Sequence, residues 1–114
     1  DMKHQVRLSS YRVMWLLVVF DLPVVSKLDR KNYAVFRKDL LKDGFTMMQF
    51  SVYIRHCSSQ QRMDVHVRRI RKSLPPKGHV SILQITDRQY GNIINFWQKS
   101  EKSLPSGPKQ LEFF

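Results

Sequence analysis

Asp21 is the residue of this sequence best placed to bind a metal ion. It directly follows an unbroken apolar run, Val13–Phe20, which is rich in β-branched residues. The run is shorter than the roughly 20 residues that cross a bilayer, and with Pro23 ending it we expect a central strand buried on both faces. A carboxylate at the end of such a strand lies on a rigid support at the rim of the core, where it can hold a hard dication.

The same aspartate has a second interpretation. Asp is common at the start of turns, and Asp21 stands two residues before Pro23. The residues alone leave both interpretations open, a metal ligand or an ordinary turn residue.

Two other chemically versatile positions carry weaker signals. His56 and Cys57 are adjacent, but no second pair stands at the spacing that a zinc site needs. His66 lies in a basic segment with no carboxylate spaced to partner it, so we expect a solvated side chain rather than a general base. Asp21 therefore carries the clearest signal for a metal ligand.

The charge of the chain indicates a polyanionic partner. Lys and Arg number 20 against 9 Asp and Glu, which gives a formal net charge of +11. An ordinary solvated surface is the alternative for the basic helix faces. The candidates for nucleic-acid contacts are Arg30, Lys31, Arg37, Lys38, Arg68, Arg69, Arg71 and Lys72.

The cysteine content and the lack of a leader pattern favour the cytoplasm. Cys57 is the single cysteine, so no internal disulfide can form, which is typical of a reducing compartment. The apolar run has no small-residue cleavage site after it, so we expect neither a signal peptide nor a membrane partner.

Hydrophobic periodicity and capping residues predict the first elements. Ser26 opens a capping-box pattern for a helix that runs to about residue 43, before Gly44. The expected buried stripe of this helix is Tyr33, Phe36, Leu40 and Leu41. Alternation over Phe45–His56 predicts one strand, with Met48, Phe50, Val52 and Ile54 on its apolar face.

The rest of the chain repeats this order. A second helix, capped by Ser58 or Ser59 and ended by Pro75, buries Met63, Val67, Ile70 and Leu74. His79–Ile85 is predicted to be a strand, Thr86 to cap one helical turn closed by Gly91, and Asn92–Trp97 to be a further strand.

We interpret this as a β-α-β-β-α-β order, an α+β ferredoxin-like sandwich with an extra C-terminal strand. Residues 1–12 would be a basic N-terminal arm, 13–97 the ferredoxin-like domain, and 98–114 a linker and a C-terminal partner-docking strand.

A sheet of this kind has helices on one face only, so its other face would be bare in a monomer. A bare apolar sheet face indicates a surface that binds a partner. Trp15 and Tyr53 are expected on that bare face. The tail alternates Leu111 and Phe113 with polar residues and needs a sheet edge, in this subunit or in another. We therefore expect a homodimer.

The sequence resembles the CRISPR-associated protein 2 family from about Arg12 to Trp97. Each motif alone is weak, and their order and spacing together are specific. The motifs are Val18-Val19-Phe20-Asp21-Leu22-Pro23, Phe36-Arg37-Lys38-Asp39-Leu40-Leu41, Gly44-Phe45, Gln49-Phe50-Ser51-Val52-Tyr53, Pro75-Pro76-Lys77-Gly78 and Thr86-Asp87-Arg88-Gln89-Tyr90.

The resemblance implies more than the residues show. Members form homodimers in which the strand-end aspartate, here Asp21, faces its mate and the pair binds one Mg²⁺ or Mn²⁺. They are assigned metal-dependent cleavage of RNA or duplex DNA, and they serve as the central spacer of the complex with the CRISPR integrase subunit. Many members have Tyr before the aspartate, where this chain has Phe20.

Three functions stay open at this stage. The first is a metal-dependent endonuclease that uses Asp21 from both subunits, and the second is a structural adaptor in spacer acquisition without physiological nuclease activity. The third is a monomeric ferredoxin-like RNA-binding module, which would need aromatic residues exposed on its central strands.

Overall fold

The fold is organised around its central strand, β1 (Val13–Asp21), in a computed structural model that describes residues 12–105. β1 pairs antiparallel with β3 (Val52–His56) on one side and with β4 (His79–Thr86) on the other. β2 (Thr46–Gln49) pairs with β3 at the edge, so the strand order is β2-β3-β1-β4. This order confirms the predicted α+β, ferredoxin-like class.

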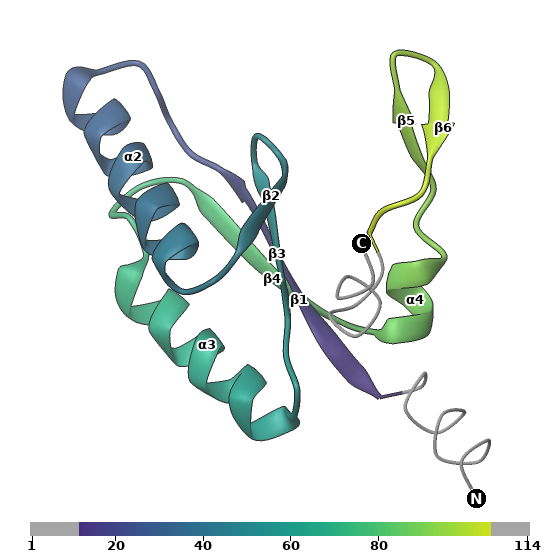
Figure 1. The fold of residues 1–114 in the computed structure, drawn as a ribbon. Coiled ribbons are helices and arrows are strands. Elements are labelled where there is room, and N and C mark those ends of the chain that lie inside the picture. The colour runs from purple at the N-terminus through teal and green to yellow at the C-terminus, as the bar shows by residue number, and fades with distance from the viewer. Residues whose placement is uncertain (1–11, 106–114) are drawn as a thin grey trace, which may run out of the picture.

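Two long helices cover one face of this sheet, as Figure 1 shows. α2 (Lys27–Lys42) begins at a capping box, in which the Ser26 hydroxyl accepts the Asp29 N–H at 2.9 Å and the Asp29 carboxylate accepts the Ser26 N–H. α3 (Gln60–Ser73) is capped by Ser59. The predicted helix starts are therefore confirmed, and Gly44 follows α2 with the positive φ of +86° that the sequence predicts.

The main core lies between these helices and the sheet. Leu16, Val18 and Phe20 alternate along β1 toward the helices and are at most 4% exposed. They meet buried side chains of α2 and α3, namely Phe36, Leu40, Met63 and Ile70. Full burial of each such side chain contributes about 1.5–3 kcal/mol, so this layer supplies most of what holds the helices on the sheet. Leu41 and Leu74, which were predicted to be buried, are 40% and 47% exposed.

The segment Phe45–His56 is a hairpin, and its prediction as one strand is wrong. The chain turns at Phe50 and Ser51, and Phe50 is 82% exposed at the tip. A register shift between Met47 and Gln49 adds to the turn, so alternation does not continue through the segment. As a result the segment supplies both β2 and β3 of the main sheet.

A smaller layer occupies the opposite face of the sheet. α4 (Asp87–Gly91) starts at the predicted Thr86 capping box. It places Tyr90 in a second apolar cluster with Trp15, Leu17 and Ile54. This cluster covers one end of the face, whereas Val19 and Leu83 remain 37% and 43% exposed farther along it.

The strand predicted over Asn92–Trp97 does not join the main sheet. Only β5 (Asn95–Trp97) is extended, and it forms a separate hairpin with β6 (Ser100–Lys102). Gln98 and Lys99 connect them with φ of 51° and 71°, the signature of a tight hairpin turn. β6 thus occupies the first residues of the predicted linker. Leu111 and Phe113, like the N-terminal arm up to residue 11, lie outside the described residues.

Gly78 sets the start of β4 against the end of β1. It has a φ of +97°, and a Cβ there would lie 2.7 Å from the Asp21 carbonyl oxygen and 2.7 Å from Leu22 Cδ2. Only a residue without a side chain allows this close approach. The next residue, His79, then pairs with Asp21 across the sheet.

Gly78→Ala is expected to lower the free energy of unfolding by roughly 2–4 kcal/mol, because the left-handed backbone and the clash each cost about 1–2 kcal/mol. Gly91→Ala is the control, since nothing lies within 4 Å of its Cβ position, and its effect should stay below about 0.5 kcal/mol. Urea unfolding at one protein concentration measures both. Equal midpoints for the two variants would contradict this role of Gly78.

Candidate functional site

Asp21 lies where the sequence predicts it, exposed at the end of the buried central strand. Side chains alternate along β1, so Asp21 shares the face of Trp15 and Leu17 and points away from α2 and α3. β4 pairs with Asp21 itself through His79, whereas the pairing with β3 ends at Val19, so β4 holds the backbone at Asp21. This arrangement fits a carboxylate ligand on a rigid support.

One chain does not supply a complete metal site. Among residues 12–105 no three His, Cys, Asp or Glu side chains gather closely enough to hold a metal ion. Asp29 and Asp39 lie in α2, Asp43 caps it, and Asp64 lies in α3. A dication at Asp21 would therefore need ligands from a second chain and from water.

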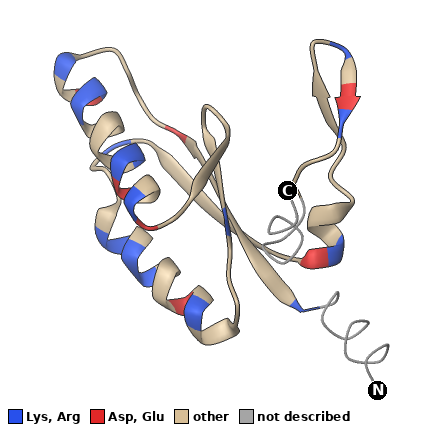
Figure 2. Ribbon diagram, viewed as in Figure 1, with Lys and Arg blue, Asp and Glu red and all other residues tan. Residues whose placement is uncertain are grey.

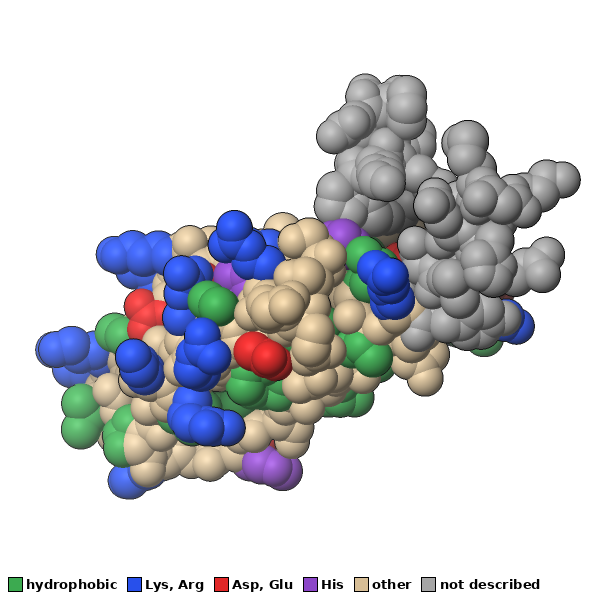
Figure 3. All heavy atoms as spheres, turned by 90° about the horizontal axis from the view of Figure 1, so that it is seen from below, with side chains coloured by type: hydrophobic (Ala, Val, Ile, Leu, Met, Phe, Trp, Pro, Cys, Tyr) green, Lys and Arg blue, Asp and Glu red, His purple; other side chains and the backbone are tan. Residues whose placement is uncertain are grey.

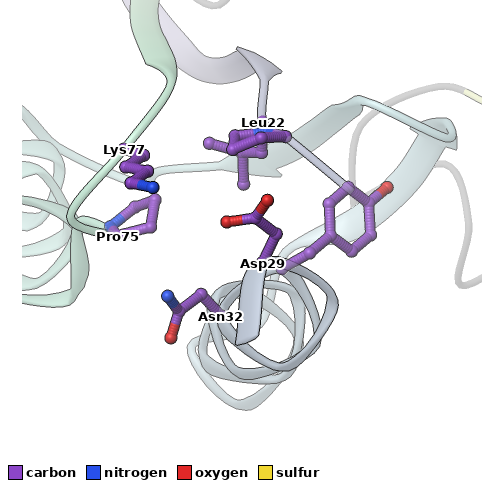
Figure 4. Close-up of a pocket in the computed structure, with 7 residues that line it drawn as sticks. Leu22, Asp29, Asn32, Pro75 and Lys77 are labelled. Atoms are coloured by element: carbon purple, nitrogen blue, oxygen red, sulfur yellow. The ribbon is translucent and has the colours of Figure 1, made fainter. Parts of the chain in front are cut away.

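A small pocket lies between Leu22, which follows β1, and the start of α2 (Figure 4). Leu22, Asp29, Asn32, Pro75 and Lys77 line it, and its volume of ≈ 10 Å³ is enough for about one water. The Ser26 backbone N–H lowers the pKa of the Asp29 carboxyl group, which is thereby engaged in capping. The pocket is too small for a nucleotide, so any polymeric substrate would bind on the open surface.

The outer surfaces of α2 and α3 carry the predicted basic residues. Bands of Lys and Arg run along both helices in Figure 2, and the blue side chains gather over this part of the molecule in Figure 3. All eight candidates are exposed: Arg30, Lys31, Arg37, Lys38, Arg68, Arg69, Arg71 and Lys72. We call this surface the basic helix face.

Two members of this face have structural partners. Arg30 donates to the carbonyl oxygens of Val24 and Val25, at 3.3 and 2.8 Å. These acceptors are neutral, so the two bonds do not offset the positive charge of Arg30. Arg69 donates to Asp43 Oδ1 at 2.6 Å, and a carboxylate offsets its charge. Arg69 is therefore the weakest of the eight as a phosphate contact.

His66 is buried and paired, so its prediction as a solvated residue is wrong. It is 4% exposed, and its Nδ1 lies 2.7 Å from Asp43 Oδ2. Asp43 stands 23 positions earlier, at the end of α2, so spacing within one helix could not reveal the pair. Asp43 thus joins His66 and Arg69 of α3 to α2, and it holds the two basic helices side by side.

The prediction that Tyr53 lies on the bare sheet face is wrong, and Trp15 lies on the predicted face but is covered there. Tyr53 pairs with Val18, is fully buried on the helix side and packs on Phe20. Trp15 does lie on the opposite face, but Tyr90 stacks on it with ring centroids 3.7 Å apart, and its Nε1 donates to Asp87. The turn at Phe50 and the cover provided by α4 explain the two errors.

His79 is a residue near Asp21 that the sequence analysis did not single out. It is the first residue of β4 and is the Cα partner of Asp21 across the sheet. The sequence does hint at His79, because it is a polar residue at the start of a predicted strand, directly after Pro75-Pro76-Lys77-Gly78. The pairing of that strand end with Asp21 required the sheet register.

Comparisons with known proteins agree on one family. The family described as CRISPR associated protein Cas2 matches residues 14–93. A protein of Flavobacterium psychrophilum is 46% identical over 98% of this chain and 97% of its own length. One from Parvibaculum lavamentivorans is 48% identical over 89% of the chain and 100% of its length, and one from Paracidovorax avenae is 45% identical over 94% and 99%. All three are named CRISPR-associated endoribonuclease Cas2.

No helix within residues 12–105 is long and apolar enough to span a membrane.

Asp43→Ala should lower the free energy of unfolding by roughly 1–3 kcal/mol, because it leaves the buried His66 nitrogen without its partner. Asp64→Ala is the matched control: it removes the same charge from an exposed site on α3, where, within residues 12–105, Asp64 accepts from Gln60 of the same helix. Its effect should stay below about 0.5 kcal/mol. Similar losses for both variants in chemical denaturation would contradict a structural role of Asp43.

Proposed function

This chain belongs to the CRISPR associated protein Cas2 family, and from that premise we propose that it is a nucleic-acid-binding homodimer with a metal-dependent nuclease site at Asp21. The observation that carries the proposal is the exposed carboxylate at the rigid end of β1, on the sheet face that α2 and α3 leave open. The names of the relatives describe them as endoribonucleases, which supports nuclease chemistry here.

Two features support the homodimer. Val19 and Leu83 remain exposed on the same face as Asp21, where a second subunit can cover them. The β5–β6 hairpin carries Ile94, Phe96 and Trp97 at 68%, 64% and 45% exposure. A two-stranded hairpin is marginally stable alone, so pairing with a further sheet edge would stabilise it.

The metal would be held by Asp21 of both subunits, with water completing the shell of a Mg²⁺ or Mn²⁺ ion. Such an ion, when bound, stabilises charge on a phosphate and lowers the pKa of its water. The protein's own contribution is to hold the two carboxylates on stiff strands and to bring the polyanion to the dimer. Phe20, the residue before Asp21, has no polar group and is buried in the core at 4% exposure. It therefore contributes nothing polar to the site.

A structural adaptor in spacer acquisition is the second candidate, and one observation favours it. The basic helix face covers the side of the sheet opposite to Asp21, so the proposed binding surface and the proposed cutting site point in different directions. A protein that holds duplex DNA beside an integrase subunit needs the first surface and not the second.

A monomeric RNA-binding module would need exposed aromatic residues on its central strands, but the aromatic residues on β1 and β3 are buried. Trp15 and Phe20 of β1 and Tyr53 of β3 are at most 5% exposed. This alternative is therefore dropped.

Asp21→Asn separates the two remaining functions. The amide keeps the shape and removes the charge, so metal affinity and nuclease activity should both fall at least about ten-fold, because an amide is a poorer ligand for a hard dication. Sedimentation should still give a dimer, and DNA binding should be unchanged. Cleavage at the wild-type rate would refute the metal role of Asp21, and a monomer at micromolar wild-type concentration would refute the dimer.

The basic helix face should bind phosphates without reading bases, so affinity should fall steeply with salt and not depend on sequence. Replacing Arg37, Lys38, Arg68 and Arg71 by Gln should reduce the log–log salt slope for duplex DNA by about 0.9 for each phosphate that is no longer neutralised. Lys102→Gln, on the exposed β6, is the control for net charge. An unchanged slope in the fourfold variant would contradict the assignment.

A further inference from the structure

Asp21 has an imidazole beside it on the neighbouring strand. His79 is its direct Cα partner in the antiparallel pairing of β1 with β4. Residues directly opposite in such a pair have Cβ atoms about 4.5–5.5 Å apart and share one face of the sheet. Both side chains are exposed, so both are accessible to a ligand on the face away from α2 and α3.

The position of His79 is set by the backbone. Gly78 brings the chain against the Asp21 carbonyl, where any Cβ would clash at 2.7 Å. His79 follows immediately as the first residue of β4. The imidazole is therefore attached to the same rigid frame that holds the carboxylate.

Ser81 gives the imidazole an orientation. It lies two residues along β4, on the same face, with its Oγ 3.2 Å from His79 Nε2. When Nε2 carries the proton, the Nε2–H donates a hydrogen bond to the Ser81 hydroxyl oxygen, and Nδ1 keeps a free lone pair. Metal-binding histidines commonly have this arrangement, in which one ring nitrogen bonds an oxygen and the other faces the metal.

We propose that His79 is a further metal ligand, with Ser81 as its positioning residue. The proposal rests on the proposed function, in which Asp21 of two subunits holds a dication. Each subunit then offers one carboxylate oxygen and one imidazole nitrogen, and the dimer offers two of each. Imidazole ligands suit Mn²⁺ and the later first-row dications, whereas Mg²⁺ takes oxygen ligands. The site should therefore prefer Mn²⁺ to Mg²⁺.

The test is metal binding to the full-length, tag-free dimer. Calorimetry with Mn²⁺ and with Mg²⁺ gives the ratio of the two affinities, and pulsed electron paramagnetic resonance of bound Mn²⁺ detects a coordinated nitrogen. In His79→Ala the Mn²⁺ affinity should fall about ten-fold or more, the Mg²⁺ affinity should stay within about two-fold, and the nitrogen coupling should vanish. Gln84→Ala, at an exposed position of β4 paired with Leu16, is the control and should change none of these.

The positioning role of Ser81 has its own readout. Ser81→Ala should lower the Mn²⁺-to-Mg²⁺ affinity ratio, and Ser81→Thr, which keeps a hydroxyl, should restore it. A loss that Thr does not restore would overturn this role.

The possible outcomes distinguish a failure of the His79 ligand from a failure of the proposed metal site at Asp21. If Asp21→Asn abolishes binding but wild type shows no nitrogen coupling and His79→Ala leaves the affinity ratio unchanged, His79 is not a ligand and the Asp21 site stands. If wild type binds neither ion, the metal part of the proposed function fails, and this inference fails with it.

Discussion

The double pairing of β1 is the constraint on which the rest of the structure depends. Hydrogen bonds to β3 and β4 fix its register, so from Trp15 to Asp21 its side chains alternate between two faces. Leu16, Val18 and Phe20 build the core under α2 and α3. The other set begins with Trp15 and ends with Asp21. A slip of one residue would bury the carboxylate in the apolar core, where a charge without a partner is very costly.

The parts of this fold that could be predicted from the sequence are those with local causes. The apolar run, the capping boxes at Ser26 and Thr86 and the glycine after α2 each act within a few residues, and each is found where it was predicted. Asp21 at the strand end follows from the same local pattern. The order of these parts also followed from the sequence, and the comparisons confirm the family that this order resembles.

The errors have non-local causes. The sequence alternates apolar and polar residues throughout Phe45–His56. In the structure, however, the chain reverses at a turn at Phe50, which places Tyr53 under the helices. Asp43 and His66 meet because α2 and α3 pack together, and Trp15 is covered because α4 folds back over β1. The neighbourhood of Asp21 and His79 depends in the same way on sheet register, which a single sequence does not display.

The placement of charge keeps the proposed phosphate-binding surface apart from the exposed carboxylate. The basic helix face and Asp21 lie on opposite sides of the sheet, so the sheet and the helix layer separate these cations from the carboxylate. At physiological salt the Debye length for exposed charges is about 8 Å, and a helix with its side chains is about 10–12 Å across. In the proposed function, a nucleic-acid strand held on the helices would not reach Asp21 without bending around the edge of the sheet. Binding and cleavage would then be separable, because different residues on opposite faces would carry them.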